Sequence, residues 1–251
     1  MFELFNVLEG NLSNLTPSLL LAFGFVIGLQ HATEADHVTA VATLVSKNKK
    51  LVKASLLGAL WGVGHTFTLF MAGLAVLLLA VSIPTKLALS LEFGVGLMLV
   101  VLGLSVIRSV RKNRFLDSFF SMFATKHIHP HAHGNKIHAH PHSHGEEHAH
   151  GHKSVIVGMI HGMAGSGALM LAVLSTVDSV VNGLVYITLF GIGSIVGMLA
   201  ISTIIGLPFV FTARRFGRVN KYISAAAALV SIGLGISIMY EIGILEQLFI
   251  I

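Results

Sequence analysis

The chain has 251 residues, of which 54% are hydrophobic and only 11% are charged, and it contains no cysteine. Soluble domains carry about 25% charged residues, so the composition excludes a soluble globular protein and indicates an integral membrane protein. The lack of cysteine excludes disulfides, thiolate metal sites and iron–sulfur clusters. The net charge of +5 does not indicate a nucleic-acid partner, because the basic residues lie in short loops between apolar segments.

Six apolar segments are each long enough to cross a bilayer as a helix, which takes about 20 residues. They cover residues 17–45, 53–83, 87–107, 154–177, 183–211 and 222–244. We therefore expect an all-α polytopic membrane protein with six transmembrane helices. The first segment would be about 43 Å long as a straight helix, so we expect a break near its middle. Three glycines, Gly162, Gly165 and Gly167, favour a break in the fourth helix as well.

The Lys and Arg residues predict the orientation of the chain. Fifteen of the sixteen lie in the loops that follow the first, third and fifth segments, and Lys86 is the exception. The positive-inside rule makes these loops cytoplasmic and both termini extracytoplasmic, in a cell (inner) membrane. The expected regions are an extracytoplasmic N-terminus (1–16), a three-helix repeat (17–108), a cytoplasmic His-rich disordered loop (109–153), a second three-helix repeat (154–244) and an extracytoplasmic C-terminus (245–251).

The two halves of the chain resemble each other. GLQHATEADHVTAV aligns with GMIHGMAGSGALML at an offset of 130 residues, WGVGHT with FGIGSI at 129, and LVVLGLSVI with LVSIGLGIS at 130. Repeats of three spans must be inverted relative to each other in the membrane, so the pattern predicts a 3+3 inverted repeat, a common transporter plan. The alternative is that glycine-rich membrane helices resemble one another without a repeat.

Four ionisable residues lie within seven positions of the first segment: His31, Glu34, Asp36 and His37. Such groups inside an apolar span are costly and mark functional sites. On a regular helix His31, Glu34 and His37 form one stripe. Asp36 joins them only if the helix opens, or else it orients His37 from outside the ligand set. Imidazoles with a carboxylate suit a first-row divalent metal; the alternative is a polar network that packs the bundle.

The second and fourth segments each add one histidine. His65 lies in GVGHT and His161 in HGMAGSGAL, and we expect both to complete or gate the same metal site. The alternatives are a packing histidine in the second segment and simple small-residue packing in the fourth. Glu92, near the outer end of the third segment, is expected to lie at the membrane interface.

The segment 127–152 is rich in histidine, proline, glycine and charge, a composition that cannot build a core. Its alternating imidazoles suit loose accessory binding of Ni²⁺, Co²⁺, Zn²⁺ or Cu²⁺, and the alternative is a pH-sensitive spacer. The histidines are His127, His129, His131, His133, His138, His140, His142, His144, His148, His150 and His152.

The string HATEADH has the pattern His-x4-Asp-His, which resembles the signature of the nickel/cobalt transporter (NiCoT) superfamily. GVGHT and HGMAGSGAL resemble its UreH-like branch. The resemblance implies that Ni²⁺ or Co²⁺ is bound or guided by His31, Asp36 and His37, and His65 matches the second-span histidine of the family. Three features depart from the usual pattern: Gln30 replaces an Arg, Glu34 replaces an Asp, and two further spans of better-studied members are absent.

We therefore predict a transporter of Ni²⁺, Co²⁺ or both, rather than an enzyme, that takes up the metal through a midplane His/Asp/Glu site. Its partners would be the metal ion, the bilayer and a cytoplasmic metal acceptor protein, with no organic cofactor and no nucleic acid. Proton exchange at the histidines could release the metal, because binding needs neutral imidazole. The alternatives are efflux by the same architecture, zinc transport, and an intramembrane metalloenzyme.

Overall fold

The computed structural model describes residues 17–46, 48–79, 84–111, 130–133, 136–139, 146–163 and 180–249. The helices are α2 (Pro17–His31), α3 (Ala35–Val45), α4 (Leu51–Leu79), α5 (Thr85–Arg111), α7 (Glu146–Gly162), α9 (Val180–Arg215) and α10 (Gly217–Tyr240). A π-helical turn, η2 (Glu241–Leu245), continues α10, and two short strands, β1 (Pro130–His133) and β2 (Lys136–Ala139), come between α5 and α7 in the chain.

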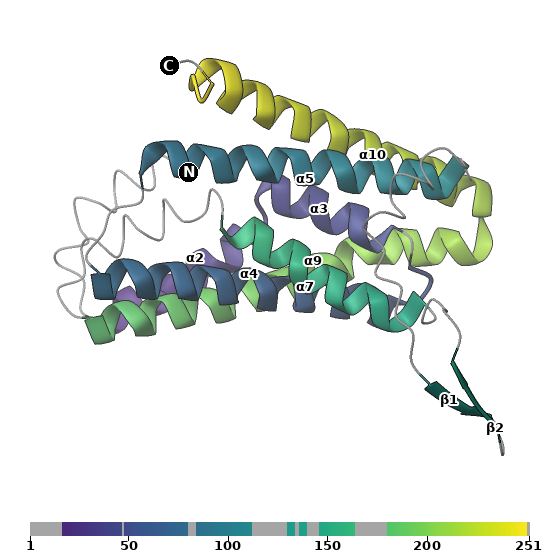
Figure 1. Ribbon diagram of the computed structural model, residues 1–251, viewed down its shortest axis with the longest axis horizontal. Coiled ribbons are helices and arrows are strands. Elements are labelled where there is room, and N and C mark those ends of the chain that lie inside the picture. The colour runs from purple at the N-terminus through teal and green to yellow at the C-terminus, as the bar shows by residue number, and fades with distance from the viewer. Residues whose placement is uncertain are drawn as a thin grey trace.

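The long helices run side by side along the longest axis of the molecule (Figure 1). Helix α4 packs against both α7 and α9, α9 also packs against α2, and α5 pairs with α10. The short helix α3 contacts α9 and α10 and lies between the α5–α10 pair and the other helices (Figure 1). The buried core accordingly gathers around α3, with Val41, Trp61, Leu99 and Met198 among its members.

Four of the described helical segments are long and apolar enough to cross a membrane. They are Leu51–Val76, Thr85–Val110, Val180–Arg215 and Gly217–Leu245. Large apolar side chains are exposed along them, such as Phe67 (57%) and Leu229 (62%), and a continuous apolar exterior of this kind suits contact with lipid. The chain is a polytopic α-helical membrane protein.

The first and fourth predicted spans differ from the other four. The first consists of two shorter helices, α2 and α3, whose apolar parts are Ala22–His31 and Ala35–Val45. The fourth is described only as α7, which ends at Gly162. Residues 164–179, where the predicted break at Gly165 and Gly167 would fall, lie outside the described residues.

The break predicted for the first span is present between α2 and α3. The Thr33 Oγ1 hydroxyl donates to the Gln30 carbonyl at 2.6 Å, and the Thr33 N–H donates to the same oxygen at 2.8 Å. Glu34 then takes an extended conformation, with φ −62° and ψ 149°, before α3 begins at Ala35. Because the helix is interrupted here, the stripe expected of a regular helix does not apply: His31 ends α2, and His37 lies in the first turn of α3.

The described stretches of the predicted loop 109–153 belong to regular elements. Strands β1 and β2 pair in antiparallel fashion, with His131 opposite His138, and α7 begins at Glu146. Histidines that alternate with other residues have the period of two that is typical of a strand. Glu146 and Glu147 favour a helix start, because negative charge is stabilising at a helix N-terminus.

Two close helix contacts correspond to each other under the predicted internal repeat. Gly28 of α2 lies against the backbone carbonyl of Phe190 in α9, and Gly158 of α7 lies against that of Trp61 in α4. The two glycines are 130 residues apart, and Trp61 and Phe190 are 129 apart. A Cβ atom on either glycine would overlap the facing carbonyl, so glycine is what permits this backbone approach.

A second pair of contacts obeys the same correspondence. Gly193 of α9 lies against the carbonyl of Phe25 in α2, and Gly64 of α4 lies against the carbonyl of Val155 in α7. These partners are again separated by 129 and 130 residues. The α2–α9 and α4–α7 interfaces are therefore built from matching positions.

Candidate metal centre

The break after α2 places His31 at the end of that helix, where it meets a histidine of α4. His31 Nε2 lies 3.1 Å from His65 Nε2, so one ring donates a hydrogen bond to the other. His31 Nδ1 lies 3.0 Å from Glu34 Oε1. Both histidines are buried, and His65 is 0% exposed.

Asp36, in the first turn of α3, joins two further histidines. Its Oδ1 accepts hydrogen bonds from Nδ1 and from the backbone N–H of His37, each at 2.8 Å. Its Oδ2 accepts one from His161 Nε2 in α7 at 3.0 Å. One carboxylate therefore connects the first predicted span to the fourth.

His37 lies at the middle of the centre. Its ring centroid is 4.2 Å from those of both His31 and His161. Potential ligand atoms come within 4.8 Å of one another in two groups, His31–His37–His65 and Asp36–His37–His161, and His37 belongs to both. The two groups therefore overlap at His37, and each could hold a metal ion.

The hydrogen bonds leave nitrogen lone pairs inside the centre. His37 Nε2, His65 Nδ1 and His161 Nδ1 are buried, and among the described residues they find no hydrogen-bond partner. An imidazole that donates from one nitrogen presents its lone pair at the other, as His37 and His161 do when each donates to Asp36. Buried polar atoms without a partner are costly, and a divalent cation that accepts nitrogen and oxygen ligands would satisfy them.

Trp61 of α4 completes the centre, although the sequence analysis did not select it. Its side chain is fully buried, and its ring centroid lies 5.2 Å from those of His37 and His161. The close contact of Gly158 with the Trp61 carbonyl brings α7 against α4 at this level. The spacing of Trp61 and His65, four residues apart on one helix, was the available signal.

The structure brings together all six membrane residues that the sequence analysis selected, which are His31, Glu34, Asp36, His37, His65 and His161. The loop histidines are described only as backbone, in strands β1 and β2 and at the start of α7, so their side chains are not placed relative to this centre.

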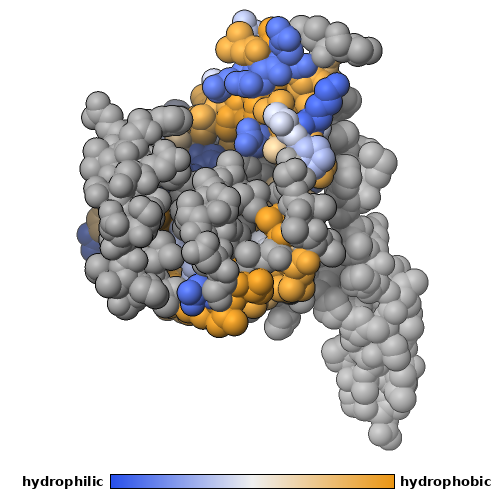
Figure 2. All heavy atoms as spheres, turned by 90° about the vertical axis from the view of Figure 1, so that its left-hand side faces the viewer, coloured by the Kyte–Doolittle hydropathy of each residue, from blue (hydrophilic) through white to orange (hydrophobic). Residues whose placement is uncertain are grey.

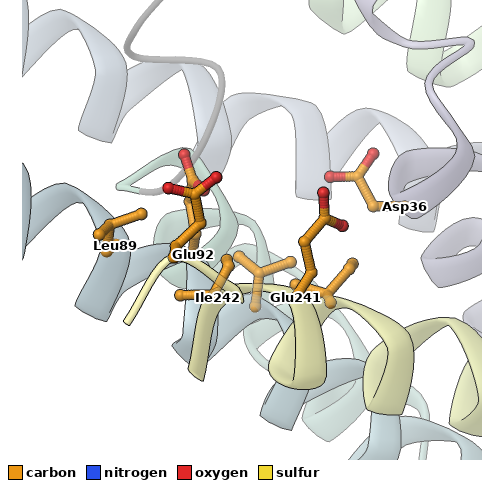
Figure 3. Close-up of a pocket in the computed structure, with 8 residues that line it drawn as sticks. Asp36, Leu89, Glu92, Glu241 and Ile242 are labelled. Atoms are coloured by element: carbon orange, nitrogen blue, oxygen red, sulfur yellow. The ribbon is translucent and has the colours of Figure 1, made fainter. Parts of the chain in front are cut away.

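Three glutamates near Asp36 were missed as site residues: Glu92, Glu241 and Glu246. Glu92, which we expect at the membrane interface, lines a pocket together with Asp36 (Figure 3).

The chain is similar over most of its length to a curated bacterial protein. It is 40% identical over 230 residues to the urease accessory protein UreH of Bacillus sp. (strain TB-90). The aligned region covers 92% of this chain and 94% of that protein. This chain belongs to the UreH family. The predicted place in the UreH-like branch of the NiCoT superfamily is thereby confirmed. That relative is named as an accessory protein of urease, which agrees with the prediction that the chain is not an enzyme.

Two plant proteins are more distant relatives of this UreH family member. They are the chloroplast proteins FOR GROWTH AND FERTILITY 1 and 2 of Arabidopsis thaliana, at 26% and 24% identity over 86% of the chain. The chain spans only 57% and 55% of their lengths. No protein-family profile matches the chain, and no solved structure matches it.

Proposed function

We propose that this protein transports Ni²⁺, Co²⁺ or both across the membrane, in the direction of uptake into the cytoplasm. The observation that carries the proposal is the convergence of four imidazoles and two carboxylates inside a membrane protein of the UreH family. Ionisable groups gathered in a membrane interior are expected to serve an ion pathway. Imidazole nitrogen with carboxylate oxygen is a ligand set for first-row divalent metals.

Each group in the centre has a distinct part in carrying the cation. Asp36 and Glu34 supply the negative charge that a dication needs at low dielectric. Asp36 also holds the rings of His37 and His161 through its two oxygens, which fixes the direction of their lone pairs. Because His37 belongs to both ligand groups, a cation can pass from Asp36 toward His31 while it stays bound to His37.

The proposed architecture has six spans in two inverted repeats, 17–108 and 154–244. The matching contacts of Gly28 with Phe190 and of Gly158 with Trp61 support it. Transporters built on this plan bind their substrate between the repeats at broken helices. Here the break after His31 belongs to one repeat and His161 belongs to the other.

The proposed orientation places the His-rich segment in the cytoplasm and both termini outside the cell (inner) membrane. The ends of α3, α5 and α9 and the starts of α4, α7 and α10 lie at one end of the bundle (Figure 1), and the sequence places fifteen of the sixteen Lys and Arg residues at or between these helix ends. The segment 109–153 would then bind metal after entry and pass it to a cytoplasmic acceptor. Its eleven histidines in 127–152 suit loose binding and rapid release.

The test compares the radioactive nickel content of cells that express the wild type, His37→Ala or His138→Ala. His37→Ala removes the residue shared by both ligand groups, and His138→Ala makes the same change in the His-rich segment. We expect the wild type and His138→Ala to accumulate nickel and His37→Ala not to. Each purified variant must show wild-type helicity by circular dichroism.

The other outcomes are equally informative. Nickel depletion in the wild type and His138→Ala alone would reverse the direction and make the protein an exporter. Equal nickel content in all three strains, at equal protein levels, would overturn nickel transport and favour zinc as the substrate.

A further inference from the structure

A pocket of about 430 Å³ lies between α5 and the end of α10 and reaches the metal centre. Four carboxylates line it: Asp36, Glu92, Glu241 and Glu246. Figure 3 shows Glu92, Glu241 and Asp36 turned toward the same space, with Asp36 at one end of the row. The remaining lining side chains are apolar, and neither Lys nor Arg is among the described residues that line the pocket.

Asp36 is common to the pocket and to the histidine centre. Its side chain is 27% exposed, whereas those of His37 and His161, which it contacts, are 1% and 2% exposed. The pocket therefore ends at the one carboxylate that holds both buried rings. Asp36 is the point at which an ion in the pocket would first meet the ligand set.

A second observation at this inner end is independent of the glutamates. His37 Nε2 and His161 Nδ1 are buried nitrogens without a hydrogen-bond partner among the described residues. Both residues form a potential metal group with Asp36. Each ring contacts Asp36 through its other nitrogen, so the pocket reaches these two rings through Asp36, and their remaining nitrogens are free to bind a divalent cation beyond it.

The pocket lies toward the end of the bundle opposite the basic connections. Glu92 follows the start of α5 by two turns, and Glu241 follows the end of α10. Figure 2 shows this end of the molecule, with hydrophilic residues gathered at the top, where α5 begins and α10 ends. Under the proposed orientation this end faces the outside of the cell, from which a cation would be taken up.

We propose that this pocket is the entry vestibule for the divalent cation, in which Glu92, Glu241 and Glu246 attract the ion and deliver it to Asp36. The proposal rests on the proposed function. Charges of one sign in a cleft with low-dielectric walls concentrate counterions and raise association rates 10- to 1000-fold. Because these glutamates lie outside both ligand groups, they act on the rate of arrival, whereas the ligands act on the rate of release.

The experiment measures Ni²⁺ association by stopped-flow quenching of tryptophan fluorescence in the full-length protein in lipid nanodiscs. Trp61 is the only tryptophan of the chain and lies beside His37 and His161, so it reports on the centre rather than on the His-rich segment. The test variant is Glu92→Gln/Glu241→Gln. The matched control, Glu146→Gln/Glu147→Gln, removes the same charge at the start of α7, at the other end of the bundle.

We expect the association rate of Glu92→Gln/Glu241→Gln to be about 10-fold below that of the wild type at low salt, with the dissociation rate unchanged within about twofold. Added salt should slow Ni²⁺ association with the wild type and the control. It should have less effect on this variant, because salt screens the electrostatic attraction that the substitutions have already removed. Glu92→Asp/Glu241→Asp keeps the charge and should keep the fast, salt-sensitive association. Asp36→Asn should instead accelerate dissociation.

Two results would overturn the proposal that the pocket is an entry vestibule. One is a Glu92→Gln/Glu241→Gln association rate and salt dependence equal to those of the control. The other is slow association in the Asp variant as well, which would mean that the shape of the pocket matters and its charge does not. Failure of the proposed function looks different: Ni²⁺ would then leave wild-type Trp61 fluorescence unchanged, or would quench His37→Ala equally.

Discussion

Among the single residues of the centre, Asp36 contacts both the histidine rings and the acidic pocket. Its two oxygens accept hydrogen bonds from His37 and His161, and the same side chain lines the acidic pocket. Glu34, by comparison, reaches His31 at 3.0 Å but lies 4.0 Å from His37. Removal of the negative charge should therefore weaken Ni²⁺ binding more at Asp36 than at Glu34.

Asp36→Asn keeps the shape of the side chain and removes its charge. We expect the equilibrium affinity for Ni²⁺ to fall about 10- to 100-fold, the usual cost of disturbing groups that hold metal ligands, and Glu34→Gln to cost less. The measurement is a titration of Trp61 fluorescence with NiCl₂ in the purified protein. An Asp36→Asn affinity equal to that of the wild type would contradict the central role of this carboxylate.

At the scale of helices, glycines decide how closely the elements that carry the site can approach. Gly158 permits contact between α7 and α4 beside Trp61, and Gly162 of α7 lies against the His65 carbonyl. These contacts place His161 opposite the residues of α3. Other glycines have no such role, since a Cβ atom at Gly94 or Gly233 would meet no neighbouring heavy atom within 4 Å.

Gly158→Ala should separate α4 from α7 and destabilise the protein by about 1–3 kcal/mol, the usual cost of overpacking. Gly94→Ala and Gly233→Ala make the same change in open space and should be neutral or stabilising by up to about 1 kcal/mol, since alanine favours helix. Thermal unfolding of the purified proteins measures the difference. Equal unfolding midpoints for Gly158→Ala and Gly94→Ala would mean that the α4–α7 contact relaxes freely.

For the whole molecule, the proposed direction of transport depends on which end of the bundle faces the cytoplasm. Exposed Lys49 and Lys50 precede α4, and exposed Lys86 lies near the start of α5. The long helices connect these two ends (Figure 1). The acidic pocket lies toward the Lys86 end, so the orientation decides whether it serves entry or exit.

The lack of cysteine in the chain makes the orientation directly measurable. In intact cells, Lys86→Cys should react with a membrane-impermeant maleimide, and Lys50→Cys should react only after permeabilisation, because the positive-inside rule places Lys50 in the cytoplasm. The wild type is the unreactive control. The opposite labelling pattern would turn the pocket toward the cytoplasm and favour efflux.

The sequence alone determined the class of protein, the break in the first span and the six ionisable side chains that lie together in the structure. Each of these follows from a local cost: apolar length decides membrane insertion, excess length forces a break, and ionisable groups in a span mark a functional centre. The residues of HATEADH and the histidines of the second and fourth segments could be selected without knowing which residues surround them in the fold.

Only the tertiary structure decided which groups contact one another. Asp36 and His161 are 125 residues apart and meet because α7 packs closely on α4 while the broken helix turns α3 toward both. The position of Glu92 in the sequence indicated no partner, and packing of α5 against α10 places it with Glu241 and Asp36 in the lining of one pocket. A contact between distant segments depends on how whole helix surfaces pack together, and this packing cannot be derived from the energetics of a single segment.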